Sequence, residues 1–295
     1  MRKQIEQCAN RNRVRADMRK CGNMCLYRRA LTGVLAVLLA VEISACGGKA
    51  KPGQETGVSQ KAEITQEKAS AQVWKDMRPE RSMELSYAKQ FSVDYYNGGY
   101  DLIQVQDDST CLVVPEGAAV PEGLPASITV LQKPLDHVYL AATSAMDLIA
   151  ALGRVDRITL SGTKESGWYV DAARQAMEDG TLSYAGKYSA PDYEQILSSG
   201  CDLALESTMI YHVPDVKAQL EQLKIPVFVE RSSYEEHPLG RMEWIRLYGV
   251  LFDAEETAEQ LFQEQVQQLY MVLTGQSVGK SAAFFYITSN GAVNV

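Results

Sequence analysis

Short apolar segments with the composition of β-strands alternate with segments of helical periodicity between residues 134 and 252. The alternation has short connections and predicts a mainly parallel sheet with helices on both faces, which is a three-layer α/β lobe. The expected strands are 137–141, 155–160, 201–205 and 225–229, and the expected helices are 144–152, 168–177, 191–197 and 214–223.

Ligands of such sheets bind in the loops at the carboxyl ends of the strands. These loops are expected at 142–144, 161–168, 186–191, 206–213 and 230–240. Aromatic residues in or beside them are candidates for gripping a large, partly apolar ligand. The candidates are Trp168, Tyr169, Tyr188, Tyr211 and Tyr234. The alternative is that some of these rings cover helix ends, and we expect two or three of them to face a ligand.

Different patterns flank the lobe. Residues 85–115 contain three short strands of alternating polarity with turn residues between the first two, which predicts a small antiparallel β-meander. Residues 254–274 have apolar residues at helical spacing, and Asp253 with Glu256 resembles a capping box at their start. A further strand is expected at 282–287.

The first 45 residues read as an export signal. Residues 1–30 hold nine Lys or Arg against two Asp or Glu, and an apolar run follows from Leu31 to Val41. That run is short for a membrane-spanning helix. The basic part is longer than a signal needs, so Met18 and Met24 are alternative starts.

The segment Ile43-Ser44-Ala45-Cys46 resembles the lipobox of bacterial lipoproteins, which implies cleavage before Cys46 and a lipid on its thiol. A signal-anchor that happens to contain a cysteine is the alternative. Residues 46–83 are rich in Lys, Glu, Gln, Ser and Ala and are expected to form a flexible tether.

Composition narrows the function further. The chain has a net charge of −8 despite its basic start, so the exported part is a poor candidate for nucleic-acid binding. Six cysteines are present, of which Cys111 and Cys201 lie in the lobe region among apolar residues. Two buried thiols are the preferred interpretation, and a disulfide remains open in an exported protein.

The sequence contains no P-loop and no nucleophile elbow. Ser161-Gly162-Thr163 is a weak phosphate-binding hypothesis, and His212 with His237 is a weak metal hypothesis against the commoner surface histidine. No nucleophile–base set or carboxylate pair stands out, so we expect a binding protein and not an enzyme, with no metal site and no cofactor.

Pro191-Asp192-Tyr193-Glu194 within 184–197 forms a Pro-x-x-Glu motif, and a strand at 201–205 and a helix-to-strand turn at 223–229 follow it. These ordered segments resemble the same motif, strand and turn in the iron-siderophore and cobalamin substrate-binding proteins of ABC importers. Cys201 and Lys224 stand where the family usually has Pro and Gly. The segment from Leu247 to Glu259 resembles the approach to the family's linker helix, and the resemblance covers about 134–290.

The resemblance implies two Rossmann-like lobes joined by one rigid helix. It implies a first lobe with its β-meander at 84–252, a linker helix at 253–274 and the start of a second lobe at 281–295, which is largely absent, so the sequence is expected to be a fragment or a truncated product. It implies that Glu194 docks onto arginines of a permease.

Arg231 and Arg241 are candidates for contact with an anionic ferric chelate, because guanidinium groups pair well with carboxylate or catecholate oxygens. Either arginine could instead pair with Glu235, Glu236 or Glu243.

The expected function is a lipid-anchored solute-binding protein on the outer face of the cytoplasmic membrane, extracellular or periplasmic. It would capture an iron-siderophore complex and deliver it to an ABC import permease with its ATPase. Cobalamin or haem is the nearest alternative ligand. Alternatives of another class are an exported enzyme and a non-functional truncated remnant.

Overall fold

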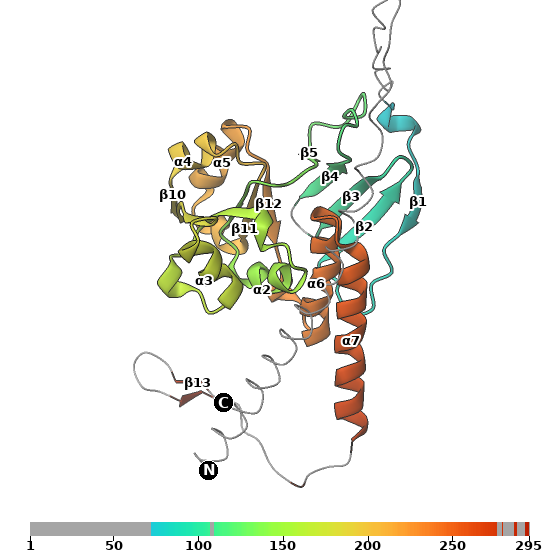
Figure 1. Ribbon diagram of the computed structural model, residues 1–295. Coiled ribbons are helices and arrows are strands. Elements are labelled where there is room, and N and C mark those ends of the chain that lie inside the picture. Colours follow the sequence, from blue (N-terminus) through green and yellow to red (C-terminus); the bar gives the residue numbers. More distant parts are fainter. Residues whose placement is uncertain (1–71, 107–108, 276–278, 280–285, 288–292, 295) are drawn as a thin grey trace, which may run out of the picture. The chain divides into compact units, whose positions relative to one another are not determined.

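The computed structural model describes residues 72–106 and 109–275, with residues 279, 286–287 and 293–294 beyond them (Figure 1). The expected signal sequence, Cys46 and most of the expected tether lie outside the described residues. Within the described part of the chain, two five-stranded sheets carry the fold. No helix in that part is both long and apolar enough to cross a membrane.

The first sheet has the order β1-β2-β3-β4-β5, and its first three pairings are antiparallel. This confirms the predicted β-meander. The fifth strand pairs with β4 in the parallel direction and was not predicted. The strands are β1 (Pro79–Ser82), β2 (Phe91–Tyr96), β3 (Tyr100–Val105), β4 (Thr110–Val114) and β5 (Ile128–Gln132).

The first strand corrects the expected tether, which does not extend to residue 83. A single-turn helix, η1 (Trp74–Asp76), and β1 both lie inside the range assigned to it. All four residues of β1 are exposed, so no alternation of apolar residues marked them as a strand. Backbone pairing with β2 holds this edge strand in place.

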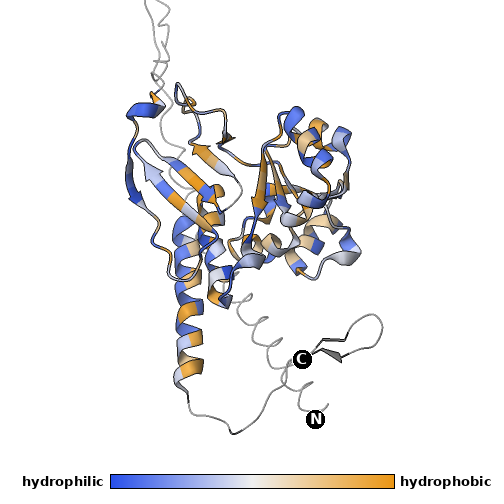
Figure 2. Cartoon of the chain, turned by 180° about the vertical axis from the view of Figure 1, so that it is seen from behind, coloured by the Kyte–Doolittle hydropathy of each residue, from blue (hydrophilic) through white to orange (hydrophobic). Residues whose placement is uncertain are grey.

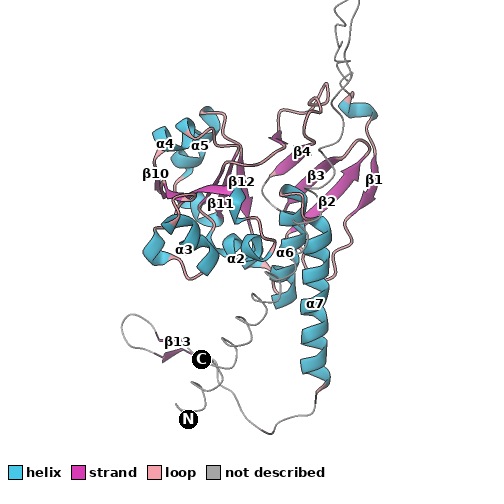
Figure 3. Cartoon of the chain, in the orientation of Figure 1, coloured by secondary structure: helices cyan, strands magenta, loops and turns pink. Residues whose placement is uncertain are grey.

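The second sheet is entirely parallel, with the order β12-β11-β6-β7-β8, which confirms the predicted α/β lobe. Its strands are β6 (Val138–Leu140), β7 (Ile158–Ser161), β8 (Ser183–Tyr184), β11 (Leu203–Ser207) and β12 (Val227–Glu230). The helices that cover it are α2 (Thr143–Ala151), α3 (Asp171–Glu178), α4 (Tyr193–Ser198) and α5 (Pro214–Gln222) (Figure 3).

The two faces of the parallel sheet belong to different hydrophobic clusters, as the period of two in a strand requires. On β11, Leu205 packs in the cluster that includes α2 and α3, whereas Ala204 packs in the cluster that includes α4 and α5. Burial on both faces explains why these strands read as continuous apolar runs.

A buried helix, α6 (Pro238–Leu251), was missed by the sequence analysis, which placed a loop at its start. Ten of its fourteen residues are buried, so it lacks the polar stripe that marks an amphipathic helix. It packs against α2 and against the long helix α7 (Glu255–Thr274), whose span confirms the predicted long helix.

The helix α7 begins without a side-chain cap and ends with exposed apolar residues. The predicted capping box is wrong, because Asp253 has a φ of 53° and its carboxylate bonds Lys133 at 2.6 Å, while no side chain caps the helix. Ala258 and Phe262 are buried near the beginning of the helix. Its last turns expose apolar surface (Figure 2), formed by Tyr270, Met271, Val272 and Leu273.

The remaining described elements are short. They are η2 (Val155–Arg157), η3 (Glu165–Gly167), β9 (Gly186–Lys187), β10 (Ala190–Pro191), η4 (Thr208–His212), η5 (Ser232–Tyr234), β13 (Tyr286–Ile287) and β14 (Val293–Asn294). The β13 strand falls inside the strand expected at 282–287, and the rest of that expected strand lies outside the described residues.

Candidate functional site

The strand order places a topological switch point between β6 and β11. The chain runs outward from β6 to β7 and β8, and then crosses to the other side of β6 to form β11. Ligands of open α/β sheets bind outside the carboxyl ends of the strands at such a point. There the amides of Ala141 and Ala142 both donate to Leu205 O, at 2.9 and 3.1 Å. The carboxyl edge of this sheet is therefore the candidate site.

One buried carboxyl group lies at this edge without a partner. Glu206, the penultimate residue of β11, is completely buried, and neither of its oxygens has a hydrogen-bond partner in the described part of the chain. Burial raises the pKa of Glu206 to about 8. This residue was not among the predicted site residues, although a glutamate directly after the apolar run Leu203–Leu205 was a usable signal.

A second buried carboxylate is fully engaged. Glu230 ends β12, where Oε1 accepts a hydrogen bond from the Ser144 hydroxyl and Oε2 accepts one from the Ser232 amide at 2.9 Å. Ser144 lies in the first turn of α2, which follows β6. Glu230 therefore ties the start of α2 to the end of β12 across the switch point.

Arg231 and Arg241 are both tied to the turn η5. The Arg231 guanidinium lies 4.6 Å from the ring centroid of Tyr234, and its Nε donates to Gln90 Oε1 at 3.2 Å. Arg241 donates from Nη2 to Ser233 O at 3.0 Å. Within the described residues neither arginine forms an ion pair with a carboxylate.

The glutamates that offered an alternative pairing for these arginines are engaged elsewhere. Glu236 pairs with Lys89 at 3.3 Å. Glu243 accepts from the amides of Ser86, Tyr87 and Ala88 at 2.7–2.8 Å. Glu235 accepts from the amides of Lys89 and Gln90 and from the Trp244 indole. Two glutamates thus bind five consecutive amides of the loop 86–90, and we call this arrangement the amide clamp.

The five candidate aromatic residues separate into three groups by exposure. Trp168 is a core residue, which differs from the expectation: it is 5% exposed, and its indole donates to Ser161 Oγ at 3.2 Å. Tyr188 is half-buried in the turn between β9 and β10. The remaining three are exposed in loops after β7, β11 and β12, and they are Tyr169, Tyr211 and Tyr234.

The expected docking residue is on the surface. Glu194 is exposed in the first turn of α4, and the helix is capped by Asp192, whose Oδ1 accepts from the Gln195 amide at 3.0 Å. The carboxylate of Glu194 is thus available to a partner, and capping of the helix does not depend on it.

The residues of the phosphate-binding and metal-binding hypotheses include side chains with structural roles. The Ser161 hydroxyl is occupied, since it accepts from Trp168 and from the Thr163 amide and donates to Thr163 O. His237 caps α6 through Nδ1 and stacks on Tyr87 with 4.7 Å between ring centroids. No group of three or more His, Cys, Asp or Glu in the described residues could hold a metal ion.

The cysteines are not bridged to each other. Cys111 is buried, and Cys201 is half-buried and donates to Leu203 O at 3.3 Å. Burial raises the pKa of the Cys201 thiol to about 11, so it carries little thiolate.

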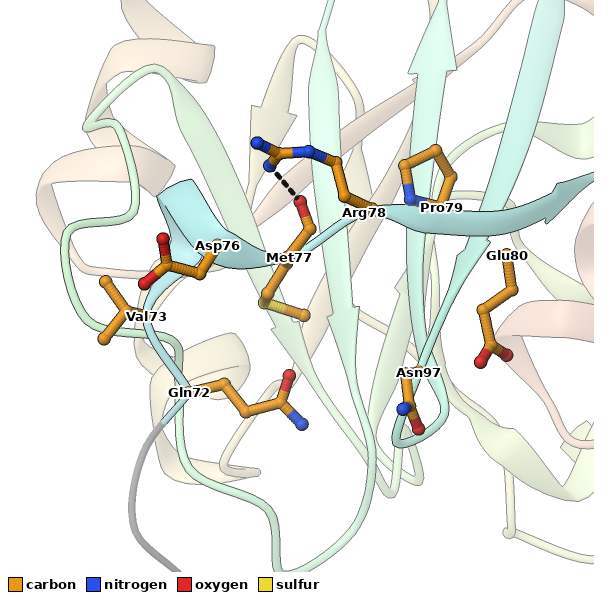
Figure 4. A pocket seen from close by; sticks show the side chains of 8 residues that line it. All are labelled: Gln72, Val73, Asp76, Met77, Arg78, Pro79, Glu80 and Asn97. Carbon is orange, nitrogen blue, oxygen red and sulfur yellow. Dashed lines mark hydrogen bonds between the residues drawn. The ribbon is translucent and has the colours of Figure 1, made fainter.

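A cavity of about 480 Å³ lies elsewhere, beside β1 of the first sheet (Figure 4). Its lining mixes acidic and basic side chains, and the Arg78 guanidinium bonds the Met77 carbonyl at 2.7 Å. It begins at Gln72, the first described residue, and it belongs to the antiparallel sheet. We therefore retain the carboxyl edge as the candidate site.

Comparisons with known proteins give distant relatives. No family model matches the sequence. An uncharacterized lipoprotein of Methanocaldococcus jannaschii is 22% identical in an alignment 253 residues long that covers 79% of this chain. The chain spans 59% of the length of that lipoprotein, so the activity and partners of a whole protein are matters of proposal.

Solved structures with similarity to the chain are periplasmic ligand-binding proteins. A haem-binding protein from Pseudomonas aeruginosa is 20% identical, with 46% of this chain and 44% of that chain covered and a TM-score of 0.37. A vitamin B12-binding protein of Vibrio cholerae is 19% identical, with 54% and 58% covered and a TM-score of 0.38. A haem-binding protein of the same organism is 19% identical, with 53% and 56% covered and a TM-score of 0.40.

Proposed function

We propose that this chain is the first lobe of a lipid-anchored solute-binding protein that captures an anionic iron chelate outside the cytoplasmic membrane and delivers it to an ABC importer. The environment of Arg231 is the observation that indicates an anionic ligand. Its guanidinium lies at the end of β12 on the Tyr234 ring, and no carboxylate of the described chain neutralises it. An oriented cation beside an exposed ring suits an anionic ligand with a flat, partly apolar body.

The sheet topology supports ligand binding at this edge. The loops after β7, β11 and β12 present Tyr169, Tyr211 and Tyr234, each more than a third exposed. Arg241 of α6 adds a second cation, because its guanidinium donates to Ser233 O of the turn η5, which Arg231 precedes. Haem is the second candidate ligand, because its carboxylates and planar ring would use the same arginines and tyrosines.

Two surfaces accommodate the macromolecular partners of this function. Glu194 presents an exposed carboxylate for arginines of a permease. The exposed apolar end of α7, residues 270–273, would be covered by a second lobe. A second lobe would bury more of the ligand, so we expect the isolated lobe to bind its ligand more weakly than a two-lobed protein.

A titration of the purified chain tests the ligand class. We expect a ferric tris-catecholate or haem to bind, and Arg231→Ala to weaken that binding about tenfold or more, in line with the loss of a close charge pair. Arg81→Ala is the matched control, since Arg81 of β1 lies over the Tyr95 ring of β2 in a comparable cation–π contact in the antiparallel sheet. Equal binding by Arg231→Ala and wild type would refute the proposed role of Arg231.

Replacement of Cys46 tests the anchor. We expect Cys46→Ala to move the protein from the membrane fraction to the soluble fraction, because a diacylated cysteine supplies the hydrophobic attachment. Fractionation followed by immunoblotting measures the change, with Cys201→Ala as the control. Membrane retention of the Cys46→Ala protein would contradict the lipid anchor.

A further inference from the structure

Gln90 brings the antiparallel sheet into the candidate site. It lies immediately before β2, outside the parallel sheet, and its Oε1 accepts a hydrogen bond from Arg231 Nε at 3.2 Å. Its backbone amide donates to Glu235 Oε1 at 3.0 Å. One residue from a distant part of the sequence therefore bonds both the proposed anion-binding arginine, which precedes η5, and the glutamate that follows η5.

The amide clamp fixes the position of Gln90. Glu235 is 4% exposed and also accepts from the Lys89 amide at 2.9 Å and from the Trp244 indole at 3.0 Å. Glu243, which is completely buried, holds the three amides that precede Lys89. Backbone amides held by buried carboxylates lose their freedom to move, so the Gln90 side chain starts from a fixed point.

The contacts of Arg231 leave one edge available. Nε is bonded to Gln90, and one face of the guanidinium lies on Tyr234. The terminal nitrogens Nη1 and Nη2 have no acceptor within the described part of the chain. That terminal edge can still bind two oxygens of a carboxylate or catecholate together.

The chemistry of Gln90 determines how much charge the ligand meets. A carboxamide accepts the Nε hydrogen bond without adding negative charge, whereas a glutamate at the same place would form an ion pair with Arg231. A neutral partner thus orients the guanidinium and preserves its full charge for a ligand.

We propose that Gln90 is a positioning residue that orients Arg231 toward an anionic ligand and, by being uncharged, sets the preference of the site for anionic over uncharged chelates. This inference rests on the proposed function. It adds a residue from the antiparallel sheet to the ligand selectivity of the carboxyl edge.

A charge series of ligands tests the role of Gln90. The purified chain is titrated with a trianionic ferric tris-catecholate and with an uncharged ferric tris-hydroxamate. We expect Gln90→Glu to weaken binding of the trianionic probe about tenfold or more, to change binding of the uncharged probe by less than about twofold, and to lose its effect in high salt. Gln90→Ala should give a smaller loss with the same selectivity.

Gln104→Glu is the matched control. It introduces the same charge on the same sheet, at a side chain that accepts a hydrogen bond from Ser92 on the neighbouring strand and is not bonded to Arg231. Equal weakening of both probes by Gln90→Glu, or no weakening of either, would overturn the proposed role of Gln90. Binding of only the uncharged probe by the wild-type chain would overturn it as well.

A ligand-independent measurement separates this inference from the proposed function. If the wild-type chain binds neither probe, the proposed function fails, and modification of Arg231 by phenylglyoxal then decides the role of Gln90. In Gln90→Ala the Nε hydrogen bond that holds the Arg231 guanidinium in place is lost. Phenylglyoxal should therefore modify Arg231 about threefold faster or more, while the rate for Arg241 stays unchanged. Equal Arg231 rates in the two proteins would overturn the inference.

Discussion

Buried glutamates occur in the amide clamp and at the switch point, and the two regions differ in whether the carboxyl oxygens have hydrogen-bond partners. In the amide clamp, Glu243 and Glu235 accept five consecutive backbone amides and the Trp244 indole. At the switch point, Glu206 is equally buried and its oxygens have no partner in the described chain. The same residue type therefore stabilises one region and imposes a cost on the other.

The comparison shows that burial alone does not determine whether a polar group stabilises or destabilises the folded state. Each intramolecular hydrogen bond contributes about 1 kcal/mol net, whereas a buried group left unsatisfied costs about 1–3 kcal/mol. Glu243 joins the loop before β2 to α6, so its bonds hold the two sheets' elements together. Glu206 costs stability at the edge where ligands of such sheets bind, which is where unsatisfied groups are expected to have a functional explanation.

The largest expected effect is the loss of the clamp. Glu243→Ala would leave three buried or half-buried amides without an acceptor and would remove one of the partners of the Arg246 guanidinium, at 3.3 Å. We expect the free energy of unfolding to fall by about 3–5 kcal/mol, as when one member of a buried charged pair is removed. Urea denaturation followed by tryptophan fluorescence measures it, because Trp244 lies in the core beside the clamp.

Glu259→Ala is the control for that experiment. Glu259 also binds Arg246, at 2.8 Å, but its side chain is 44% exposed, and its other hydrogen bond comes from the Gln263 side chain and not from a backbone amide. We expect a loss below about 1 kcal/mol, as for other surface ion pairs. If Glu243→Ala cost no more than Glu259→Ala, the clamp would not be the structural connection that its geometry indicates.

The second effect is opposite in sign and depends on pH. Burial raises the pKa of Glu206 from 4.5 to about 8 in the folded protein. The folded state therefore favours protonated Glu206. The free energy of unfolding has its full value below about pH 4.5, where Glu206 is protonated in both states, and the contribution of protonated Glu206 is lost as the pH rises through 8. We expect Glu206→Gln to be more stable than wild type by about 1–3 kcal/mol near pH 9 and nearly equal to it near pH 5.

Urea denaturation of both proteins across this pH range measures the difference. Asp101 is the other buried carboxyl group with a raised pKa, about 6, and it is present in both proteins, so its contribution cancels. A stability difference that did not grow between pH 6 and 8 would show that Glu206 has a partner that satisfies its charge.

The contrast between these glutamates also explains what the sequence could predict. The parallel sheet and its helices were predictable, because alternation of short apolar strands and helices is a local signal. Glu206 carried a local signal as well, since it follows three apolar residues of one strand. The amide clamp did not, because Glu235 bonds residues 145–146 positions away in the chain.

The missed elements follow the same physical division. Nothing in the run Tyr234–His237 distinguishes buried Glu235 from exposed Glu236, which becomes evident only when α6 packs against the loop before β2. That helix was itself missed because burial on most sides removed its polar stripe. Trp168 was assigned to the ligand surface because its position in a loop was predictable and the direction of its side chain was not.

The smallest expected effect on stability concerns an exposed carboxylate, Glu194. Its side chain lies in the first turn of α4, where the helix dipole favours a negative charge by a few tenths of a kcal/mol. We expect Glu194→Ala to change the free energy of unfolding by less than about 0.5 kcal/mol. Its neighbour Asp192 is the matched control, because it caps the helix and Asp192→Ala should cost about 1 kcal/mol.

For transport we expect the opposite order, with a larger effect of Glu194→Ala than of Asp192→Ala. In a two-lobed version of the protein, Glu194→Ala should reduce chelate uptake by cells while chelate binding by the purified protein stays unchanged, because the proposed role of this exposed carboxylate is to bind a permease and not the ligand. Asp192→Ala should lower stability without a selective loss of uptake. Weaker chelate binding by Glu194→Ala would place Glu194 in the ligand site, and unchanged uptake would remove it from the docking surface; either result would contradict the division between buried carboxylates that hold the lobe and an exposed one that addresses a partner.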